Sequence, residues 1–130
     1  MIILDSSALA ALAAGHPRLH RVMDAALHSP FRHLVVPVLC LVEAEIEDEG
    51  AARAVLALPS LEFEPLDAST AVLVATMVRD GYGSQGLAHA IAASLPTPAR
   101  PQQHLILTAD PELYPPGVVT VDIDDPRLEP

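Results

Sequence analysis

Three acidic residues, Asp5, Glu43 and Asp110, stand at positions from which they could act together. Asp5 directly follows the apolar run 2–4, Asp110 closely follows the strand-like run 104–107, and Glu43 ends an otherwise apolar stretch. The carboxyl ends of parallel strands meet at one edge of a sheet, where sites are built. Clustered carboxylates repel one another unless a cation is bound, which suits Mg²⁺ or Mn²⁺. Two such ions could activate a water and steady the leaving oxygen of a phosphodiester.

Asp5 also has a simpler interpretation. Ser6 and Ser7 are natural caps for the helix-like pattern that follows, so Asp5 would lie beside a partly positive helix start. One acid alone does not decide between a helix cap and a functional carboxylate, and both interpretations stay open at this point.

The composition indicates one small globular domain. The chain has 130 residues, of which 51% are hydrophobic, enough for a core of its own. No apolar run is long enough to span a membrane, and the N-terminus does not resemble a signal peptide. The single cysteine, Cys40, excludes an internal disulfide and suits a reducing compartment. We therefore expect a cytoplasmic protein that does not enter a membrane.

The charge balance is strongly acidic. Seventeen Asp and Glu residues against seven basic residues give a net charge of −10, and all of the basic residues are arginine. Such a surface does not attract nucleic acid by bulk electrostatics. Chemistry on a nucleic acid would require bound cations or a basic partner, although most of these acids simply keep a small domain soluble.

Strand-like and helix-like segments alternate along the chain, which predicts a parallel α/β sheet with helices on both faces. A glycine-rich loop is expected at 80–86, in one domain over 1–121 followed by an exposed, frayed acidic tail at 122–130. The expected strands are 2–4, 34–36, 61–64, 104–107 and 117–121, and the expected helices are 6–14, 17–27, 38–48, 51–58, 67–79 and 87–95.

Four short segments, in this order and at these distances, resemble the PIN domain family, specifically the small VapC-type toxins of bacterial toxin–antitoxin pairs. The resemblance runs from Met1 to about Val121. It implies a three-layer α/β/α fold with a central parallel sheet of four or five strands, and a metal-dependent ribonuclease with acids around Mg²⁺ or Mn²⁺. The segments that carry it are 2–9, 37–43, 87–93 and 105–110.

The resemblance also assigns roles to individual residues. Asp5 matches the family's first acid, Glu43 its second and Asp110 the acid after the late strand, and these three would hold the metal. The implied supporting residues are Ser7, which fits a hydroxyl position beside the first acid, Thr108, which matches the hydroxyl next to Asp110, and Glu112, a further acid.

His89 stands where the family's third acid is expected, at the start of the helix after the glycine loop. Magnesium prefers oxygen ligands, whereas manganese or zinc tolerates nitrogen, and nearby acids would raise the pKa of the imidazole. His89 is then either an interior polar residue of a silent domain or a ligand or proton carrier in a working site. A third interpretation shifts the register and lets Asp80 supply the missing acid.

Two classes of function remain open. One is an endoribonuclease toxin, with RNA as substrate, an antitoxin as partner and a homodimer as assembly. The other is a catalytically silent PIN-like domain that binds itself or another protein. The resemblance implies the dimer and the antitoxin, and the apolar second and third helices could supply the interface. A phosphorylated receiver domain is disfavoured, because the chain contains no lysine.

Overall fold

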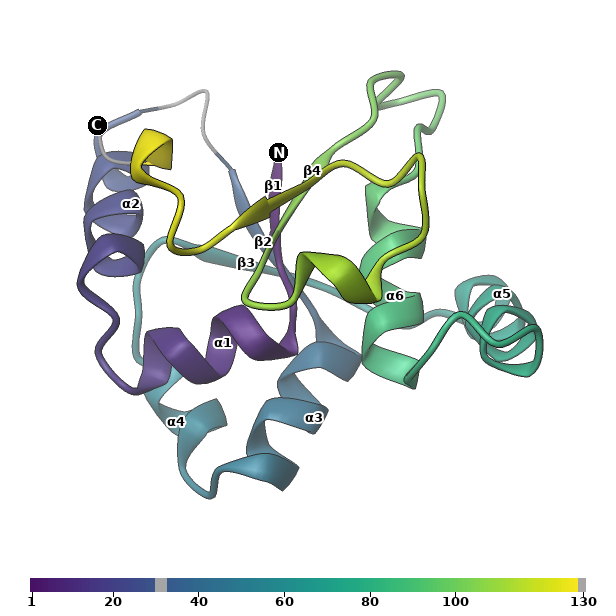
Figure 1. Ribbon diagram of the computed structural model, residues 1–130, viewed down its shortest axis with the longest axis horizontal. Helices are drawn as coiled ribbons and strands as arrows, with labels where there is room; N and C mark the ends of the chain where they lie inside the picture. Colours follow the sequence, from purple (N-terminus) through teal and green to yellow (C-terminus); the bar gives the residue numbers. More distant parts are fainter. Residues whose placement is uncertain (30–32, 129–130) are drawn as a thin grey trace.

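The protein is an α/β fold built on a five-stranded, all-parallel sheet (Figure 1). The computed structural model describes residues 1–29 and 33–128. The strand order is β3-β2-β1-β4-β5, which confirms the predicted fold class. The strands are β1 (Ile2–Leu4), β2 (Leu34–Pro37), β3 (Leu61–Glu64), β4 (Leu105–Thr108) and β5 (Thr120–Asp122).

Helices flank this sheet and connect its strands. Helix α1 contacts β1 and β4, whereas α6 contacts β1, β2 and β4. The chain moves one way across the sheet from β1 to β3 and then returns to β4, so right-handed crossovers place α1 and α6 on opposite faces. The helices are α1 (Ser6–Ala13), α2 (Pro17–Leu27), α3 (Val38–Glu47), α4 (Ala51–Leu56), α5 (Ala68–Arg79) and α6 (Gln85–Ser94), with short 3₁₀ turns η1 (Pro111–Leu113) and η2 (Pro126–Leu128).

The core lies on the central strands and on the inner sides of α1, α2 and α6. Ile3, Val36 and Ile106, from β1, β2 and β4, are fully buried. The apolar face of α2 is buried as well, which leaves it little surface for a partner. No helix in the described ranges is both long and apolar enough to cross a membrane.

Helix α6 begins at Gln85, two residues before the predicted start at Leu87. The Ser84 hydroxyl accepts a hydrogen bond from the backbone N of Leu87, 3.1 Å away, and thereby caps the helix. The glycine-rich loop is correspondingly shorter, and Gly86 lies in the first turn of the helix. The first backbone N–H groups of α6 therefore face the edge of the sheet where the candidate acids lie.

The predicted tail is not frayed over its first residues, so that prediction is wrong there. Asp122 ends strand β5, and Ile123 is only 3% exposed, with its N donating to the Thr108 carbonyl. Asp124 lies 2.8 Å from His16 Nε2, at the start of α2. Pairing with β4 and contact with α2 thus hold a segment that its acidic, proline-containing composition marked as exposed. Residues 129 and 130 of the predicted tail lie outside the described residues.

Candidate functional site

The carboxyl ends of β1 and β4 are joined by two hydroxyl side chains. Ser7 Oγ donates to Asp5 Oδ1 at 2.7 Å and accepts from the backbone N of Ala109 at 2.8 Å. Thr108 Oγ1 lies 3.2 Å from Ser7 Oγ and accepts from the backbone N of Asp110 at 3.0 Å. Ser7 and Thr108 therefore fix the two strand ends, each with its acid, against one another.

Asp5 is 6% exposed and accepts hydrogen bonds at both carboxylate oxygens. Oδ1 accepts from Ser7 and, at 3.0 Å, from the backbone N of Ala8, so Asp5 does cap α1. Oδ2 accepts from the Tyr114 hydroxyl at 2.7 Å. The two interpretations that the sequence left open are compatible, because one oxygen caps the helix while the other is turned to Tyr114.

Tyr114 was not anticipated from the sequence. It follows η1, is 9% exposed, and donates to Asp5. Two effects, burial first and the neighbouring Asp5 carboxylate second, raise the pKa of its phenol well above the usual range. The hydroxyl therefore remains protonated and acts as a donor. No spacing rule relates a tyrosine in a proline-flanked turn to an acid more than a hundred residues earlier.

Glu43 is bound by the N-terminus of α6. The backbone N of Gly86 donates to Glu43 Oε1, and Ser84 Oγ donates to Oε2 at 3.1 Å. The partial positive charge of a helix N-terminus favours such a carboxylate. A Cβ added at Gly86 would lie 2.6 Å from Glu43 Cδ, so glycine is what permits this close approach. Cys40, whose Sγ donates to the Gly86 carbonyl, packs behind this contact.

A pocket of about 270 Å³ brings the three predicted acids together. None of the residues that line it is basic. Glu47, one helical turn after Glu43, adds a fourth carboxylate, although its sequence neighbourhood resembled a solvated helix end. The i, i+4 spacing of Glu43 and Glu47 was the signal that could have found it. We call this the acidic pocket; it is lined by Asp5, Ser6, Ser7, Glu43, Glu47, Ser84, Leu87, Asp110, Leu113 and Tyr114.

Two other predicted acids do not join it. Glu112 lies on η1, is exposed, and does not line the acidic pocket. Asp80 is exposed at the end of α5 and lines a neighbouring hollow instead. The structure therefore does not support the interpretation in which Asp80 replaces the missing acid. In α6, the residue that faces the acidic pocket is the apolar Leu87.

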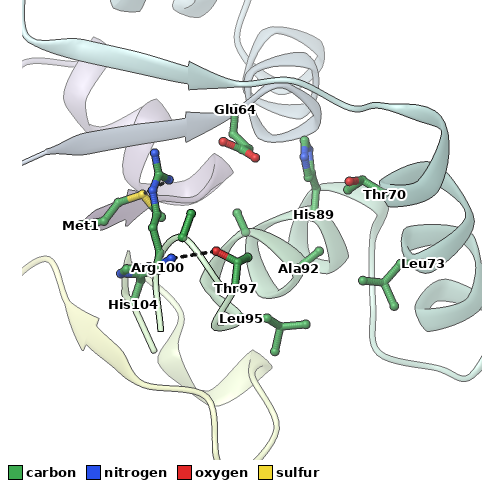
Figure 2. Close-up of a pocket in the computed structure, with 12 residues that line it drawn as sticks. Met1, Glu64, Thr70, Leu73, His89, Ala92, Leu95, Thr97, Arg100 and His104 are labelled. Carbon is green, nitrogen blue, oxygen red and sulfur yellow. Dashed lines mark hydrogen bonds between the residues drawn. The ribbon is translucent and has the colours of Figure 1, made fainter. Parts of the chain in front are cut away.

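His89 does not line the acidic pocket, contrary to the expectation that it stands in place of the third acid. Its ring lies beside Glu64 and Thr70 at a different pocket, of about 370 Å³, between α5, α6 and the end of β3 (Figure 2). Helical geometry explains the difference, since His89 follows Leu87 by two residues, about 200° around the helix axis, and the two side chains therefore point to nearly opposite sides of α6. We call this second cavity the His89 pocket.

His89 has a structural role at α3. Its Nδ1 accepts a hydrogen bond from the backbone N of Leu39 at 3.3 Å. That N–H lies in the first turn of α3, whose N-cap residue, Pro37, makes no side-chain capping bond. Burial lowers the pKa of His89, and the Pro65 carbonyl and the Glu64 carboxylate oppose that shift only in part. His89 thus caps α3 as a neutral ring.

The acidic pocket offers the donor chemistry that Mg²⁺ and Mn²⁺ require, namely carboxylate and hydroxyl oxygens. Within the described ranges no three acidic, His or Cys side chains stand ready to hold one ion together. Magnesium commonly uses only one or two carboxylates and completes its shell with water and substrate phosphate. Asp5 and Asp110, at the ends of adjacent strands, therefore fit such an ion without a closed protein cage.

Comparison with known proteins supports the fold alone. No protein-family model matches the chain, and neither does any curated protein. Among solved structures, it is similar to a chain in the crystal structure of DNA-bound VapBC from Salmonella typhimurium. The TM-score is 0.59 at 17% sequence identity, and the match covers 94% of this chain and 97% of that one. The likeness extends over nearly the whole of both chains and is one of architecture.

Proposed function

We propose that this chain is a PIN-type toxin of a toxin–antitoxin pair that hydrolyses RNA with Mg²⁺ or Mn²⁺ at the acidic pocket. The observation that carries the proposal is that Asp5, Glu43 and Asp110, from three distant segments, line one pocket at the carboxyl edge of a parallel sheet. The architectural likeness to a chain of VapBC supports the toxin–antitoxin part of the proposal.

The residues of the acidic pocket have different roles in this proposal. Asp5 and Asp110 supply the oxygens that hold the ion, and Ser7 and Thr108 keep their strand ends in place. Glu43, fixed by the N-terminus of α6, presents a further carboxylate that orients water in the pocket. The bound ion supplies a lowered pKa for water and stabilises charge on the phosphate.

The charge of the pocket makes the cation a condition for binding RNA. Four carboxylates and no basic side chain line it, so an RNA phosphate would be repelled there. The net charge of −10 adds to that repulsion over the whole surface. Cleavage is therefore expected to depend steeply on Mg²⁺ or Mn²⁺ and to stop when EDTA is added.

The experiment is RNA cleavage by Asp110→Asn compared with Glu112→Gln. Both variants remove one negative charge from the same short segment, but only Asp110 lines the acidic pocket. We expect Asp110→Asn to lose activity about a hundredfold or more, equivalent to ~3 kcal/mol of transition-state stabilisation, and Glu112→Gln to keep it. Equal activity in the two variants would refute the assignment of the site.

A second candidate function, a silent binding module, also has an observation in its favour. Every oxygen of Asp5 and Glu43 accepts a hydrogen bond from the protein, and the side chain that α6 contributes to the acidic pocket is the apolar Leu87 rather than an acid. This alternative predicts no cleavage of RNA by the wild-type chain with either metal. Replacing His89 by Asp would not test it, because His89 lies in the other pocket.

The proposed partners are a second copy of this chain and an antitoxin. Helix α3 exposes Val42 and Ile46, at 50% and 78%, whereas the apolar face of α2 is buried, so α3 is the better candidate for a homodimer or antitoxin contact. An antitoxin with basic residues would complement the acidic surface. We place the pair in the cytoplasm, which suits the free Cys40. Light scattering of the purified chain, alone and with its antitoxin, gives both stoichiometries.

A further inference from the structure

We propose that Tyr114 is a latch on Asp5: its hydroxyl occupies the carboxylate oxygen that an incoming divalent ion would use, and binding of the ion displaces it. This inference rests on the metal-dependent function proposed above. It concerns how that site is controlled, and it makes Tyr114 a positioning residue.

The two oxygens of Asp5 are not equivalent. Oδ1 is held by Ser7 Oγ and by the backbone N of Ala8, both within the first turn of α1. These bonds fix the side chain whether or not anything else is bound. Oδ2 accepts only from Tyr114 among the described residues. The orientation of Asp5 thus does not depend on Tyr114, whereas the availability of Oδ2 does.

A second hollow beside Tyr114 could receive its hydroxyl when the bond to Asp5 is broken. A buried hydroxyl that loses its acceptor is costly unless it finds another acceptor. Tyr114 forms part of the wall between the acidic pocket and a second hollow of about 380 Å³. Asp80 and Tyr82 line that hollow, so a phenol turned towards it would reach solvent and a carboxylate.

The latch is tied to the second proposed ligand. Leu113 N donates to the Asp110 carbonyl at 3.0 Å, and Tyr114 N donates to the Pro111 carbonyl at 3.2 Å. These bonds make 110–114 one short, internally bonded turn. Tyr114 and Asp110 thus belong to one turn and line one pocket with Asp5, so an ion held by Asp110 and Asp5 Oδ2 would approach Asp5 on the side where the Tyr114 hydroxyl lies. Displacing the hydroxyl from Asp5 weakens metal binding, a cost that the second proposed ligand, Asp110, does not impose.

The test is the affinity for Mn²⁺, measured by calorimetry, of Tyr114→Phe against the wild type. Phenylalanine keeps the buried ring and removes only the hydroxyl. We expect about tenfold tighter binding, the effect of one hydrogen bond to a charged group. Tyr82→Phe is the matched control, because it makes the same change at the other tyrosine that lines the hollow, which does not line the acidic pocket. Its affinity is expected to equal that of the wild type.

Tyrosine fluorescence gives a readout that a purely structural role would not change. The chain has two tyrosines and no tryptophan, so all tyrosine emission from Tyr82→Phe comes from Tyr114. A phenol bonded to a carboxylate is quenched, since its proton shifts to the acceptor on excitation. Titrating Tyr82→Phe with Mg²⁺, which is diamagnetic and does not itself quench, is expected to raise the emission as the bond breaks.

The outcomes separate the latch from the function on which it rests. Tighter binding by Tyr114→Phe together with the rise in emission supports the latch. Equal or weaker binding by Tyr114→Phe, with metal bound by both proteins, overturns the latch and leaves the metal site standing. No Mn²⁺ binding by either protein overturns the metal-dependent function, and the latch with it.

Discussion

The acidic pocket and the His89 pocket share helix α6 but treat buried polar groups in opposite ways. The first turn of α6 serves the acidic pocket, where Asp5 and Glu43 accept hydrogen bonds at every oxygen. The second turn carries His89, which uses Nδ1 to cap α3 and keeps Nε2 buried. One region neutralises charge with many donors, and the other keeps a single ring uncharged by burial.

The difference shows how the two regions depend on one another. His89 caps the start of α3, and α3 carries Glu43 to the acidic pocket. The histidine that was expected to replace a catalytic acid instead supports the helix that presents another acid. Its influence on the acidic pocket therefore passes through the backbone of α3, and it is expected to appear in stability before it appears in chemistry.

The substitution His89→Ala is expected to have the largest effect and tests whether the two pockets act separately. It removes a fully buried ring together with the cap on Leu39, and we expect a loss of about 2–4 kcal/mol in the free energy of unfolding. RNA cleavage per folded molecule is expected to stay within about threefold of the wild type, because His89 does not line the acidic pocket. Urea unfolding followed by circular dichroism, with cleavage assays in parallel, measures both quantities.

His89→Asn is the matched control for that experiment. The asparagine Oδ1 can take the place of Nδ1 and accept from Leu39, so this variant is expected to recover part of the lost stability. If folded His89→Ala protein no longer cleaves RNA, His89 takes part in the reaction, and the separation of the two pockets is contradicted.

Most of the fold could be predicted because it follows from local patterns. Apolar runs ending in polar residues place β1 and β4, and Pro17 and Asp67 mark the starts of α2 and α5, each close to its observed position. The start of α6 was missed because the Ser84 cap is stronger than the loop signal of the surrounding glycines. The docked segment after Val121 was missed because its pairing with β4 is non-local.

The site was only partly predictable, for a related reason. Asp5 and Asp110 follow from strand ends, and Ser7 and Thr108 follow from the resemblance. Whether a helical residue reaches a pocket depends on rotation about the helix axis, where one residue changes the direction by about 100°. That sensitivity explains why His89 was misplaced. The role of Tyr114 could not be predicted from local sequence, since its contact with Asp5 joins positions 109 apart.

Gly86→Ala tests the acidic side of α6, with a smaller expected effect. An alanine in a helix is normally more stable than glycine by about 0.5–1 kcal/mol. Here the new Cβ would push away the Glu43 carboxylate and break its bonds to α6, so we expect a net destabilisation of about 1 kcal/mol. Urea unfolding measures the difference between the two proteins.

The same substitution in a Glu43→Ala background supplies the control. Without the carboxylate there is nothing to displace, and Gly86→Ala is expected to stabilise the protein by about 0.5–1 kcal/mol. A change of sign between the two backgrounds would show that Gly86 is required by Glu43. Stabilisation in both backgrounds would show that the close approach of Glu43 to α6 contributes little to stability.

The smallest expected effect is the pH dependence carried by His89. Because Nδ1 accepts from Leu39, the neutral ring carries its proton on Nε2, and a second proton must displace the cap. Its pKa is lowered in the folded protein, so below the ordinary value of 6.5 the unfolded chain binds more protons and stability falls. His104 at the same pocket also has a lowered pKa and acts in the same direction. Asp67 and Asp125, whose pKa values are lowered, titrate well below this range.

Urea unfolding between pH 7 and pH 5 isolates this contribution. Stability is expected to decline over that interval in the wild type and to decline less in His89→Asn, which keeps the acceptor but does not titrate. Glu64 and Asp67 limit the size of the effect, because both carboxylates favour the charged ring. Identical slopes in the two proteins would mean that His89 is not held neutral by burial. The contrast between a charged, donor-rich pocket and a neutral one would then have to be abandoned.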